Sequence, residues 1–306
     1  MGQMNAKETV SVQDFAKDLG LEVVYEGRGF LQLDNISVSR PGLQLSGFFQ
    51  FFDSSRVQVI GNAEYGYLKT VSTETRKNHL KKLFESGIPC LILARDLAVT
   101  EELSAAAEGA NCPLFRSQKV TTFLVNDIAV YLNRLLAPQM TVHGVLLDVY
   151  GVGVLLTGNS GIGKSETALE LVKRGHRLVA DDSVIIKQIS EELIGTSPDI
   201  IRYYMEIRGI GIVNISHMFG AGSILKEKEI DLVVQLEKWQ DGKEYDRLGE
   251  KAQYETILGI KKSRIVIPVK PGRNLATIIE VAARNHRLKT MGYDAAAELI
   301  EKTMGK

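Results

Sequence analysis

Hydrophobic and polar positions alternate along the chain in a way that predicts a mixed α/β fold. Between residues 120 and 136, apolar residues recur at helical spacing and share one stripe: Leu124, Ile128, Tyr131, Leu132 and Leu135. Ser11 and Asp14 form a capping pattern that predicts a helix ending before Gly20. Short apolar runs predict strands at residues 21–25, 57–60 and 90–93, and a further helix is predicted over residues 72–86.

Pro138 marks the boundary between two predicted domains. It ends the helix of residues 120–136, and residues 137–141 have the composition of a linker. We therefore expect a first domain at residues 1–136 and a second at residues 137–306, each long enough to build its own core. The first domain contains no recognisable chemical motif, and its role cannot be inferred from its residues.

The second domain is predicted to alternate strands and helices. Strands are expected at residues 145–150, 152–156, 177–180, 230–236 and 265–269, and helices at residues 165–172, 274–289 and 295–303. Residues 205–213 are interrupted by Gly209 and Gly211 and are expected to run into a strand. This alternation is typical of the α/β class.

The segment from Gly158 to Ser165 carries the most specific chemical signal. It fits G-x-x-x-x-G-K-[ST], the phosphate-binding P-loop, and it lies between a predicted strand and a predicted helix, as that loop requires. Its residues are Gly158, Asn159, Ser160, Gly161, Ile162, Gly163, Lys164 and Ser165. The glycines allow main-chain N–H groups to surround a polyphosphate, Lys164 can reach its terminal oxygens, and the Ser165 hydroxyl can ligate Mg²⁺. We therefore predict a nucleotide or pyrophosphate site.

Two carboxylates, Asp181 and Asp182, follow the predicted strand of residues 177–180. Ligands of open α/β sheets gather at the carboxyl ends of strands, so this pair is expected beside the P-loop. A carboxylate there could hold Mg²⁺ through water or accept a proton from an attacking hydroxyl. Paired aspartates at a strand end can instead cap a turn, but the neighbouring P-loop favours the functional interpretation.

Further polar residues are weaker candidates, because each could equally form a surface ion pair or serve the fold. They are His143, Glu206, Arg208, Arg247, Lys270 and Arg273. The chain contains no N-K-x-D motif, the sequence that reads the guanine base in GTPases, so an ordinary GTPase is excluded.

Composition and charge are those of an ordinary globular protein. The 37 Lys/Arg and 37 Asp/Glu residues cancel, which argues against a nucleic-acid or membrane-surface partner. No apolar run reaches the length of a membrane span and no signal-peptide core is evident, so a cytoplasmic location is expected. The stretch from Lys261 to Lys289 has eight Lys/Arg against one acid, which suits phosphates, an acidic partner or a solvated face. Two cysteines without C-x-x-C spacing indicate neither zinc nor a disulfide framework.

Several ordered segments together resemble the bacterial HPr kinase/phosphorylase family, and the likeness spans most of the chain. They are residues 39–42, 143–145, 150–154, the P-loop, and residues 173–182, 206–209, 219–222, 245–249 and 268–274. So many matches in order are far more specific than a P-loop alone. The resemblance implies an N-terminal mixed α/β domain and a C-terminal P-loop kinase domain similar to phosphoenolpyruvate carboxykinase, assembled as a hexamer.

The resemblance also implies an activity. Enzymes of this family use Mg²⁺ and either ATP or pyrophosphate to phosphorylate a regulatory serine of the phosphocarrier protein HPr. The same site is expected to remove that phosphate by phosphorolysis, in which inorganic phosphate is the acceptor and pyrophosphate the product. In the family this activity reports glycolytic state to carbon catabolite regulation, and allosteric control is expected.

Roles follow from the resemblance residue by residue. Asp182 matches the acid/base, Lys164 and His143 match active-site cations or hydrogen-bonding groups, and Arg247 matches a catalytic arginine. Ser165 and Glu206 match the Mg²⁺ ligands.

Two further segments match by resemblance. Residues 205–214 match a segment needed in both directions of the reaction. A segment needed mainly for phosphorolysis is matched by Pro268, Val269, Lys270, Pro271, Gly272 and Arg273. Lys270 stands where arginine is common, and lysine lacks the planar fork that binds phosphate through two parallel hydrogen bonds.

Two other functions fit the P-loop without the resemblance. One is a small-molecule kinase on a similar scaffold, and the other is a nucleotide-sensing module whose N-terminal domain is the working part. Incubation with ATP, Mg²⁺ and purified HPr separates them: phosphoserine on HPr supports the family activity, whereas ATP binding without turnover supports the sensing module.

Overall fold

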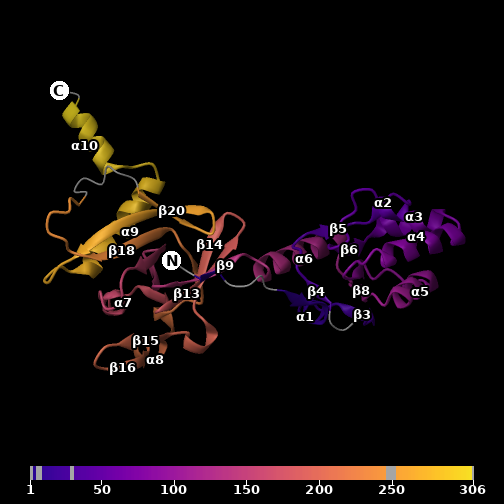
Figure 1. Ribbon diagram of the computed structural model, residues 1–306, viewed down its shortest axis with the longest axis horizontal. Helices are drawn as coiled ribbons and strands as arrows, with labels where there is room; N and C mark the ends of the chain where they lie inside the picture. Colours follow the sequence, from indigo (N-terminus) through magenta and orange to yellow (C-terminus); the bar gives the residue numbers. More distant parts are fainter. Residues whose placement is uncertain (1–2, 5–8, 28–30, 246–252, 305–306) are drawn as a thin grey trace. The chain divides into compact units, whose positions relative to one another are not determined.

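The computed structural model describes residues 3–4, 9–27, 31–245 and 253–304 of the chain (Figure 1). The described residues form two compact units that divide between Ala137 and Pro138. Strand β1 (Gln3–Met4) pairs in antiparallel register with β9 (Gln139–His143) of the second unit. This short strand therefore lies with the second unit, although the sequence placed all of residues 1–136 in one domain.

The first unit is built around one sheet with helices on both faces. Its strands are β2 (Val10–Ser11), β3 (Glu22–Tyr25), β4 (Gln32–Leu33), β5 (Val38–Ser39), β6 (Val57–Ile60), β7 (Leu91–Leu93) and β8 (Leu114–Arg116). Its helices are α1 (Val12–Asp18), α2 (Gly42–Leu45), α3 (Asn62–Thr70), α4 (Thr73–Glu85), α5 (Glu101–Ala110) and α6 (Thr121–Leu135). The sheet has the order β3-β8-β7-β6-β5, in which β5 to β8 are parallel and β3 is antiparallel.

Alternating side chains of the central strands fill two separate cores in this unit. Ile92 of β7 packs on the side of α1 and α6, whereas Leu91 and Leu93 pack on the side of α3, α4 and α5. The expected helices α1, α4 and α6 and strands β3, β6 and β7 are confirmed within one or two residues at their ends. Helices α3 and α5 and strand β8 were not anticipated.

The second unit contains two main sheets. Its remaining strands are β10 (Val145–Val149), β11 (Val152–Thr157), β12 (Arg177–Ala180), β13 (Ser183–Ile189), β14 (Glu192–Thr196), β15 (Tyr204–Ile207), β16 (Gly211–Asn214), β17 (Glu227–Glu229), β18 (Leu232–Lys238), β19 (Gln253–Ile257) and β20 (Ile260–Val269). Its helices are α7 (Lys164–Lys173), α8 (Ile215–Phe219), α9 (Leu275–Thr290) and α10 (Ala295–Met304). The larger sheet has the order β12-β10-β11-β18-β20-β19, with β11, β18 and β20 parallel. The smaller sheet, β1-β9-β13-β14-β17, is antiparallel.

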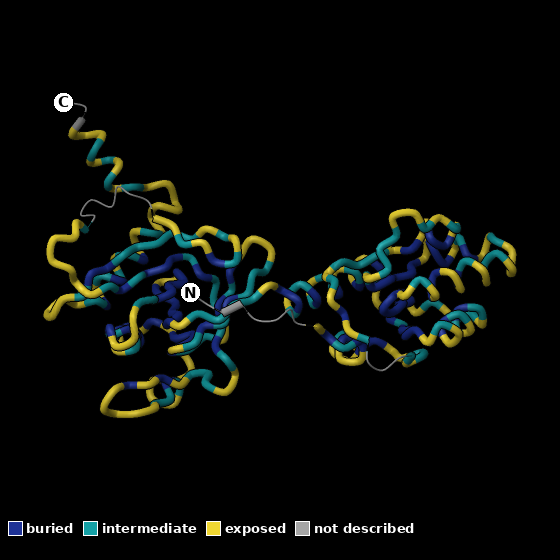
Figure 2. The backbone as a smooth tube through the Cα atoms, viewed as in Figure 1, coloured by how far each residue is buried: buried dark blue, intermediate teal, exposed yellow. Residues whose placement is uncertain are grey.

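Each face of the larger sheet is covered by a different layer. Leu147 of β10 packs with α7 and α9 on one face, whereas its neighbour Leu146 packs against the smaller sheet on the other. Figure 2 shows the buried strands surrounded by exposed loops and helix faces. The mixed α/β class and the expected strands β10, β11, β12, β18 and β20 are confirmed, as are helices α7, α9 and α10. The smaller sheet was not anticipated, and residues 205–213 form most of a hairpin, β15–β16, rather than leading into a single strand.

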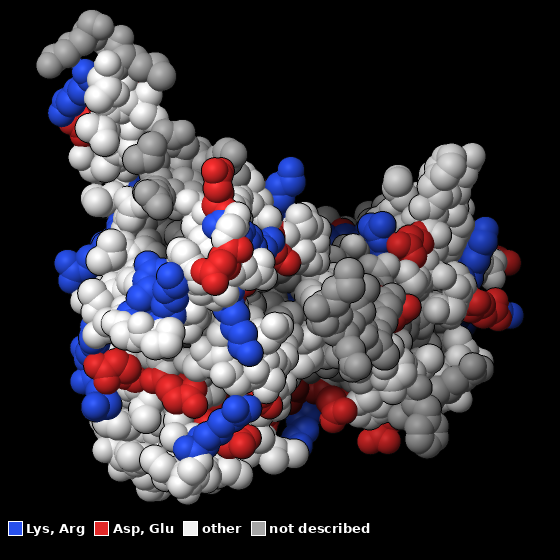
Figure 3. Space-filling model, turned by 60° about the vertical axis from the view of Figure 1, so that its left-hand side comes forward, with Lys and Arg blue, Asp and Glu red and all other residues white. Residues whose placement is uncertain are grey.

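The basic stretch of residues 261–289 does not act as one free cationic surface. Lys262 pairs with Glu229, Arg264 with Glu255, and Lys289 with Asp294. On the face drawn in Figure 3, Lys and Arg side chains lie among Asp and Glu side chains. Within the described residues, no helix has the length and apolar character needed to cross a bilayer.

Candidate active site

The P-loop lies between β11 and the N-terminus of α7, as the sequence predicts. All three of its glycines adopt positive φ angles: Gly158 (136°), Gly161 (76°) and Gly163 (100°). A Cβ on Gly158 would lie 2.4 Å from the main-chain oxygen of Leu236 on β18, so no other residue fits without moving the loop. This geometry turns the start of α7 toward the loop, where its unpaired N–H groups can bind an anion.

Replacing Gly158 with alanine tests this packing. Gly158→Ala is expected to lower the free energy of unfolding by about 1–3 kcal/mol, because the added methyl meets main chain and φ is unfavourable. Polyphosphate binding should weaken as the loop shifts. Gly66→Ala is the matched control, since Gly66 lies inside α3 and a methyl group there would meet nothing within 4 Å. That control should stabilise the protein by about 0.5–1 kcal/mol. Denaturant unfolding of the full chain measures both variants, and equal effects would contradict the packing argument.

Lys164 is buried and folds back over the P-loop. Its Nζ donates to the carbonyl oxygens of Gly158 (3.0 Å) and Asn159 (3.3 Å) and lies 3.2 Å from Nε2 of His143. Burial lowers the pKa of the Lys164 ammonium, while the nearby carboxylates of Asp182 and Asp181 act in the opposite direction. A polyphosphate bound in the loop would give this buried ammonium a counter-ion in direct contact.

Asp181 and Asp182 point in different directions at the end of β12. The side chain of Asp181 is buried, and its Oδ1 accepts a hydrogen bond from the Ser165 hydroxyl at 2.8 Å. Its Oδ2 accepts one from the main-chain N–H of Glu206 at 3.3 Å. Burial is the largest influence on Asp181 and raises its pKa, although both hydrogen bonds oppose that shift. Asp181 thus orients Ser165, a role that the sequence did not assign to it.

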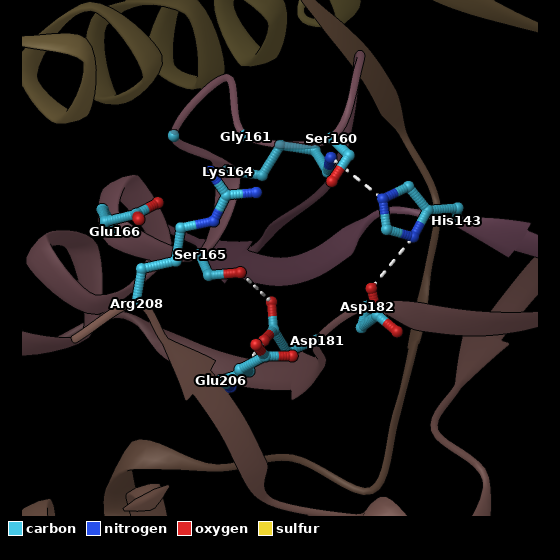
Figure 4. A pocket seen from close by; sticks show the side chains of 11 residues that line it. His143, Ser160, Gly161, Lys164, Ser165, Glu166, Asp181, Asp182, Glu206 and Arg208 are labelled. Carbon is cyan, nitrogen blue, oxygen red and sulfur yellow. Dashed lines mark hydrogen bonds and ion pairs between the residues drawn. The ribbon is translucent and has the colours of Figure 1, made fainter. Parts of the chain in front are cut away.

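Asp182 turns away because its φ is +66°, a left-handed conformation that Asp tolerates better than most residues. Its side chain is 68% exposed, and Oδ1 lies 3.0 Å from Nδ1 of His143. Because the Lys164 ammonium can only donate, Nε2 of His143 accepts and Nδ1–H donates to Asp182. Figure 4 shows His143 between the P-loop and this carboxylate.

These side chains line one polar cleft of about 120 Å³. Its lining includes His143, Ser160, Gly161, Gly163, Lys164, Ser165, Glu166, Asp181, Asp182, Glu206 and Arg208. Among the described residues, no group of three His, Cys, Asp or Glu side chains stands close enough to hold a metal ion unaided. Mg²⁺ in phosphoryl-transfer sites takes one or two protein oxygens and completes its shell with phosphate and water. The Ser165 hydroxyl and the carboxylate of Glu206 are suitable oxygen donors.

Two parts of the site matched by resemblance need separate treatment, because only one of them lies among the described residues. Arg247 lies outside the described residues. In the segment of residues 268–273, Lys270 Nζ lies 3.5 Å from the ring centroid of Trp239, and Arg273 Nη1 donates to the Pro268 carbonyl at 2.9 Å. No residue of this segment lines the cleft. Its role in phosphorolysis stays a prediction.

Neutralising Asp181 provides a test with a defined pH dependence. A carboxyl group whose pKa is raised on folding weakens the native state at neutral pH, and this cost disappears as the pH falls below its unfolded pKa. Asp181→Asn is therefore expected to stabilise the protein near pH 7 and not at low pH. Its amide cannot accept both hydrogen bonds as the carboxylate does, so Ser165 should be held less well, and the phosphotransfer that the resemblance implies should fall about 10–100-fold.

The control for that test is Asp199→Asn, because the Asp199 side chain is 86% exposed in its pair with Arg202. It should give no pH-dependent gain in stability. Free energies of unfolding measured between neutral and acidic pH test both variants. If Asp181→Asn is still more stable than the parent chain at low pH, the raised pKa of Asp181 is not the cause of the stabilisation.

Comparison of the sequence with known proteins finds two family models and several relatives that together cover nearly all of the chain. The family described as HPr Serine kinase N terminus matches residues 10–132, and the one described as HPr Serine kinase C-terminal domain matches residues 134–303. An HPr kinase/phosphorylase from Peptoclostridium acidaminophilum is 51% identical over 305 residues, covering 99% of both chains. Another from Alkaliphilus metalliredigens is 49% identical over 300 residues, covering 97% of both. A solved structure of the HPr(Ser) kinase/phosphatase from Coxiella burnetii is 41% identical and covers 52% of this chain and 97% of its own, with a TM-score of 0.48.

Proposed function

Since the chain belongs to the HPr kinase/phosphorylase family of enzymes, we propose that it moves a phosphoryl group reversibly between a polyphosphate and a serine hydroxyl of HPr. The forward donor is ATP or pyrophosphate. The reverse reaction uses inorganic phosphate and releases pyrophosphate. We assign the P-loop to the polyphosphate and the exposed Asp182 carboxylate to the acceptor side of the cleft.

The observation that carries this proposal is the line of contacts from Asp182 through His143 to Lys164. It connects an exposed proton acceptor with the cation of the P-loop over two short contacts, 3.0 Å and 3.2 Å. A serine hydroxyl entering from solvent would meet Asp182 next to the terminal phosphoryl group. Proton transfer by a positioned carboxylate requires such proximity before any tuning of its pKa.

In the forward direction, the serine Oγ attacks the terminal phosphorus and its proton passes to the Asp182 carboxylate. The bond to the bridging oxygen breaks, and ADP or phosphate leaves with the negative charge. In the reverse direction, an oxygen of inorganic phosphate attacks the phosphoserine phosphorus, and protonated Asp182 returns the proton to the leaving serine Oγ. His143 holds Asp182 in place through Nδ1–H, and Lys164 neutralises charge on the transferred group.

Mg²⁺ would be held by the Ser165 hydroxyl and by Glu206, and when bound it would offset the charge of the donor oxygens. Asp181 keeps Ser165 oriented through the 2.8 Å hydrogen bond. By the same resemblance we expect Arg247 to stabilise the transferred phosphoryl group. We expect residues 268–273 to serve mainly the reverse reaction.

The biological setting follows from the resemblance too. We propose a hexameric assembly, a cytoplasmic location and a role in carbon catabolite regulation, with HPr as the macromolecular partner. No nucleic-acid or membrane partner is expected.

Incubation of the full chain with ATP, Mg²⁺ and purified HPr tests the proposal. Phosphoserine on HPr is the expected product, and pyrophosphate should replace ATP as donor. ATP binding without transfer would support a nucleotide-sensing module instead. Transfer to a small molecule but not to HPr would identify a metabolite kinase.

A further inference from the structure

We propose that Arg208 is a second cation of the phosphate cradle and that its guanidinium binds oxygens of the polyphosphate held by the P-loop. The inference deepens the proposed function and rests on it only for the identity of the donor. It concerns binding, so it can be tested without any transfer to HPr.

A tight turn delivers Arg208 to the cleft. The main-chain N–H of Ile210 donates to the carbonyl of Ile207 at 3.0 Å, and Gly209 between them has φ = +82°. These features place Arg208 at the second position of a turn of type II, whose third position favours glycine. The hairpin is anchored beneath this turn, because Met205 and Ile207 are buried in the core that also holds the P-loop helix. The backbone that carries Arg208 is therefore held in place by the turn and by the buried side chains of the hairpin.

The guanidinium of Arg208 lies directly against the P-loop main chain. A Cβ placed on Gly161 would lie 2.8 Å from Nη1 and 3.1 Å from Nη2 of Arg208. The P-loop consensus leaves this fourth position open to any residue, yet here it is glycine. The missing side chain makes room for the arginine, and Figure 4 shows the arginine extending from the hairpin toward the loop.

The guanidinium of Arg208 has no polar partner among the described residues. Its guanidinium forms no hydrogen bond or ion pair with any of them, although Glu166 and Glu206 line the same cleft. By contrast, Arg202, two residues before β15, pairs with Asp199. Arginine carries a planar fork of N–H donors that matches phosphate oxygens. The position and the unused donors together fit a group that binds the ligand of the P-loop.

Charge in the cleft points the same way. Four acidic side chains line it (Glu166, Asp181, Asp182 and Glu206) against one lysine and one arginine, Lys164 and Arg208. Binding a polyanion there by Lys164 alone would leave the carboxylates in large excess. Arg208 and Glu206 both come from the β15–β16 hairpin. This one hairpin therefore supplies both a proposed metal ligand and a proposed phosphate ligand.

Equilibrium titration of the full chain with pyrophosphate, and separately with ATP, in the presence of Mg²⁺ tests the proposal. Arg208→Gln is expected to weaken both affinities about 10–100-fold, as for the loss of hydrogen bonds to a charged group. Arg208→Lys should recover part of the loss, because it keeps the charge without the fork. Arg202→Gln is the matched control and should bind within about twofold of the parent chain.

The unfolding free energy separates a binding role from a structural one. Because the guanidinium bonds no described residue, Arg208→Gln should unfold like the parent chain, and added methylguanidinium should restore part of the binding of Arg208→Ala. Unchanged pyrophosphate and ATP affinity in Arg208→Gln overturns the proposal, even if transfer to HPr falls. A parent chain that binds both donors but never phosphorylates HPr overturns the proposed function and leaves the role of Arg208 standing.

Discussion

Asp182→Asn is expected to lower phosphotransfer in both directions by a factor of about 10²–10⁴, while binding of ATP and pyrophosphate stays within about twofold. The amide cannot accept the serine proton, but its oxygen can still accept the hydrogen bond from Nδ1–H of His143, 3.0 Å away in the parent chain. Asparagine also tolerates the left-handed backbone at this position, where φ is +66°, so the fold should be kept.

A matched control for this variant is available in the first unit. Asp96 is likewise an exposed aspartate at positive φ, 54°, and Asp96→Asn should leave both transfer and binding unchanged. Initial rates with HPr and with phosphoserine-HPr measure the two directions. Undiminished transfer by Asp182→Asn would remove this carboxylate from the mechanism.

Lys164→Met is expected to weaken pyrophosphate and ATP binding by about 100-fold or more and to lower transfer by at least the same factor. The buried ammonium bonds both to the P-loop main chain and to His143, and no other lysine or arginine among the described residues forms hydrogen bonds to both. Stability should not fall in parallel, because burial lowers the pKa of Lys164 and its charge is therefore costly in the folded chain.

Lys173→Met at the other end of α7 is the control. Lys173 is 58% exposed and pairs with Glu170 of its own helix at 3.5 Å, so its loss should leave binding unchanged. Titration calorimetry and denaturant unfolding of both variants give the comparison. Retained polyphosphate affinity in Lys164→Met would contradict the assignment of the cleft to phosphate.

The parts of this structure that short-range patterns specify were predictable from sequence. The P-loop was located by its glycines and its Lys-Ser ending, and β11 and α7 were expected on either side of it. The helix α6 could be predicted because its apolar stripe repeats at helical spacing along most of its 15 residues. Such signals are local, so these elements can be predicted without knowing which other elements they pack against.

Features that depend on tertiary contacts could not be derived from local sequence patterns. Strand β13 alternates buried Val184 and Ile186 with half-exposed neighbours. This short alternation is a weak sequence signal for a strand, and β13 is held in place by pairing with β9 and β14 on its two sides. Asp181 faces Ser165 while Asp182 faces His143, because φ is positive at Asp182. The sequence Asp-Asp does not specify that backbone conformation. Arg208 gains its position only because the hairpin closes over Gly161, far away in sequence.

The most direct measurement is ³¹P NMR of the full chain mixed with phosphoserine-HPr, inorganic phosphate and Mg²⁺. We predict that the phosphoserine signal declines while pyrophosphate appears in equal amount, and that Asp182→Asn stops both changes. Loss of phosphoserine without pyrophosphate would show plain hydrolysis, and no loss at all would show that the cleft does not run the reverse reaction. Either result would contradict the claim that one carboxylate beside the P-loop shuttles the proton in both directions.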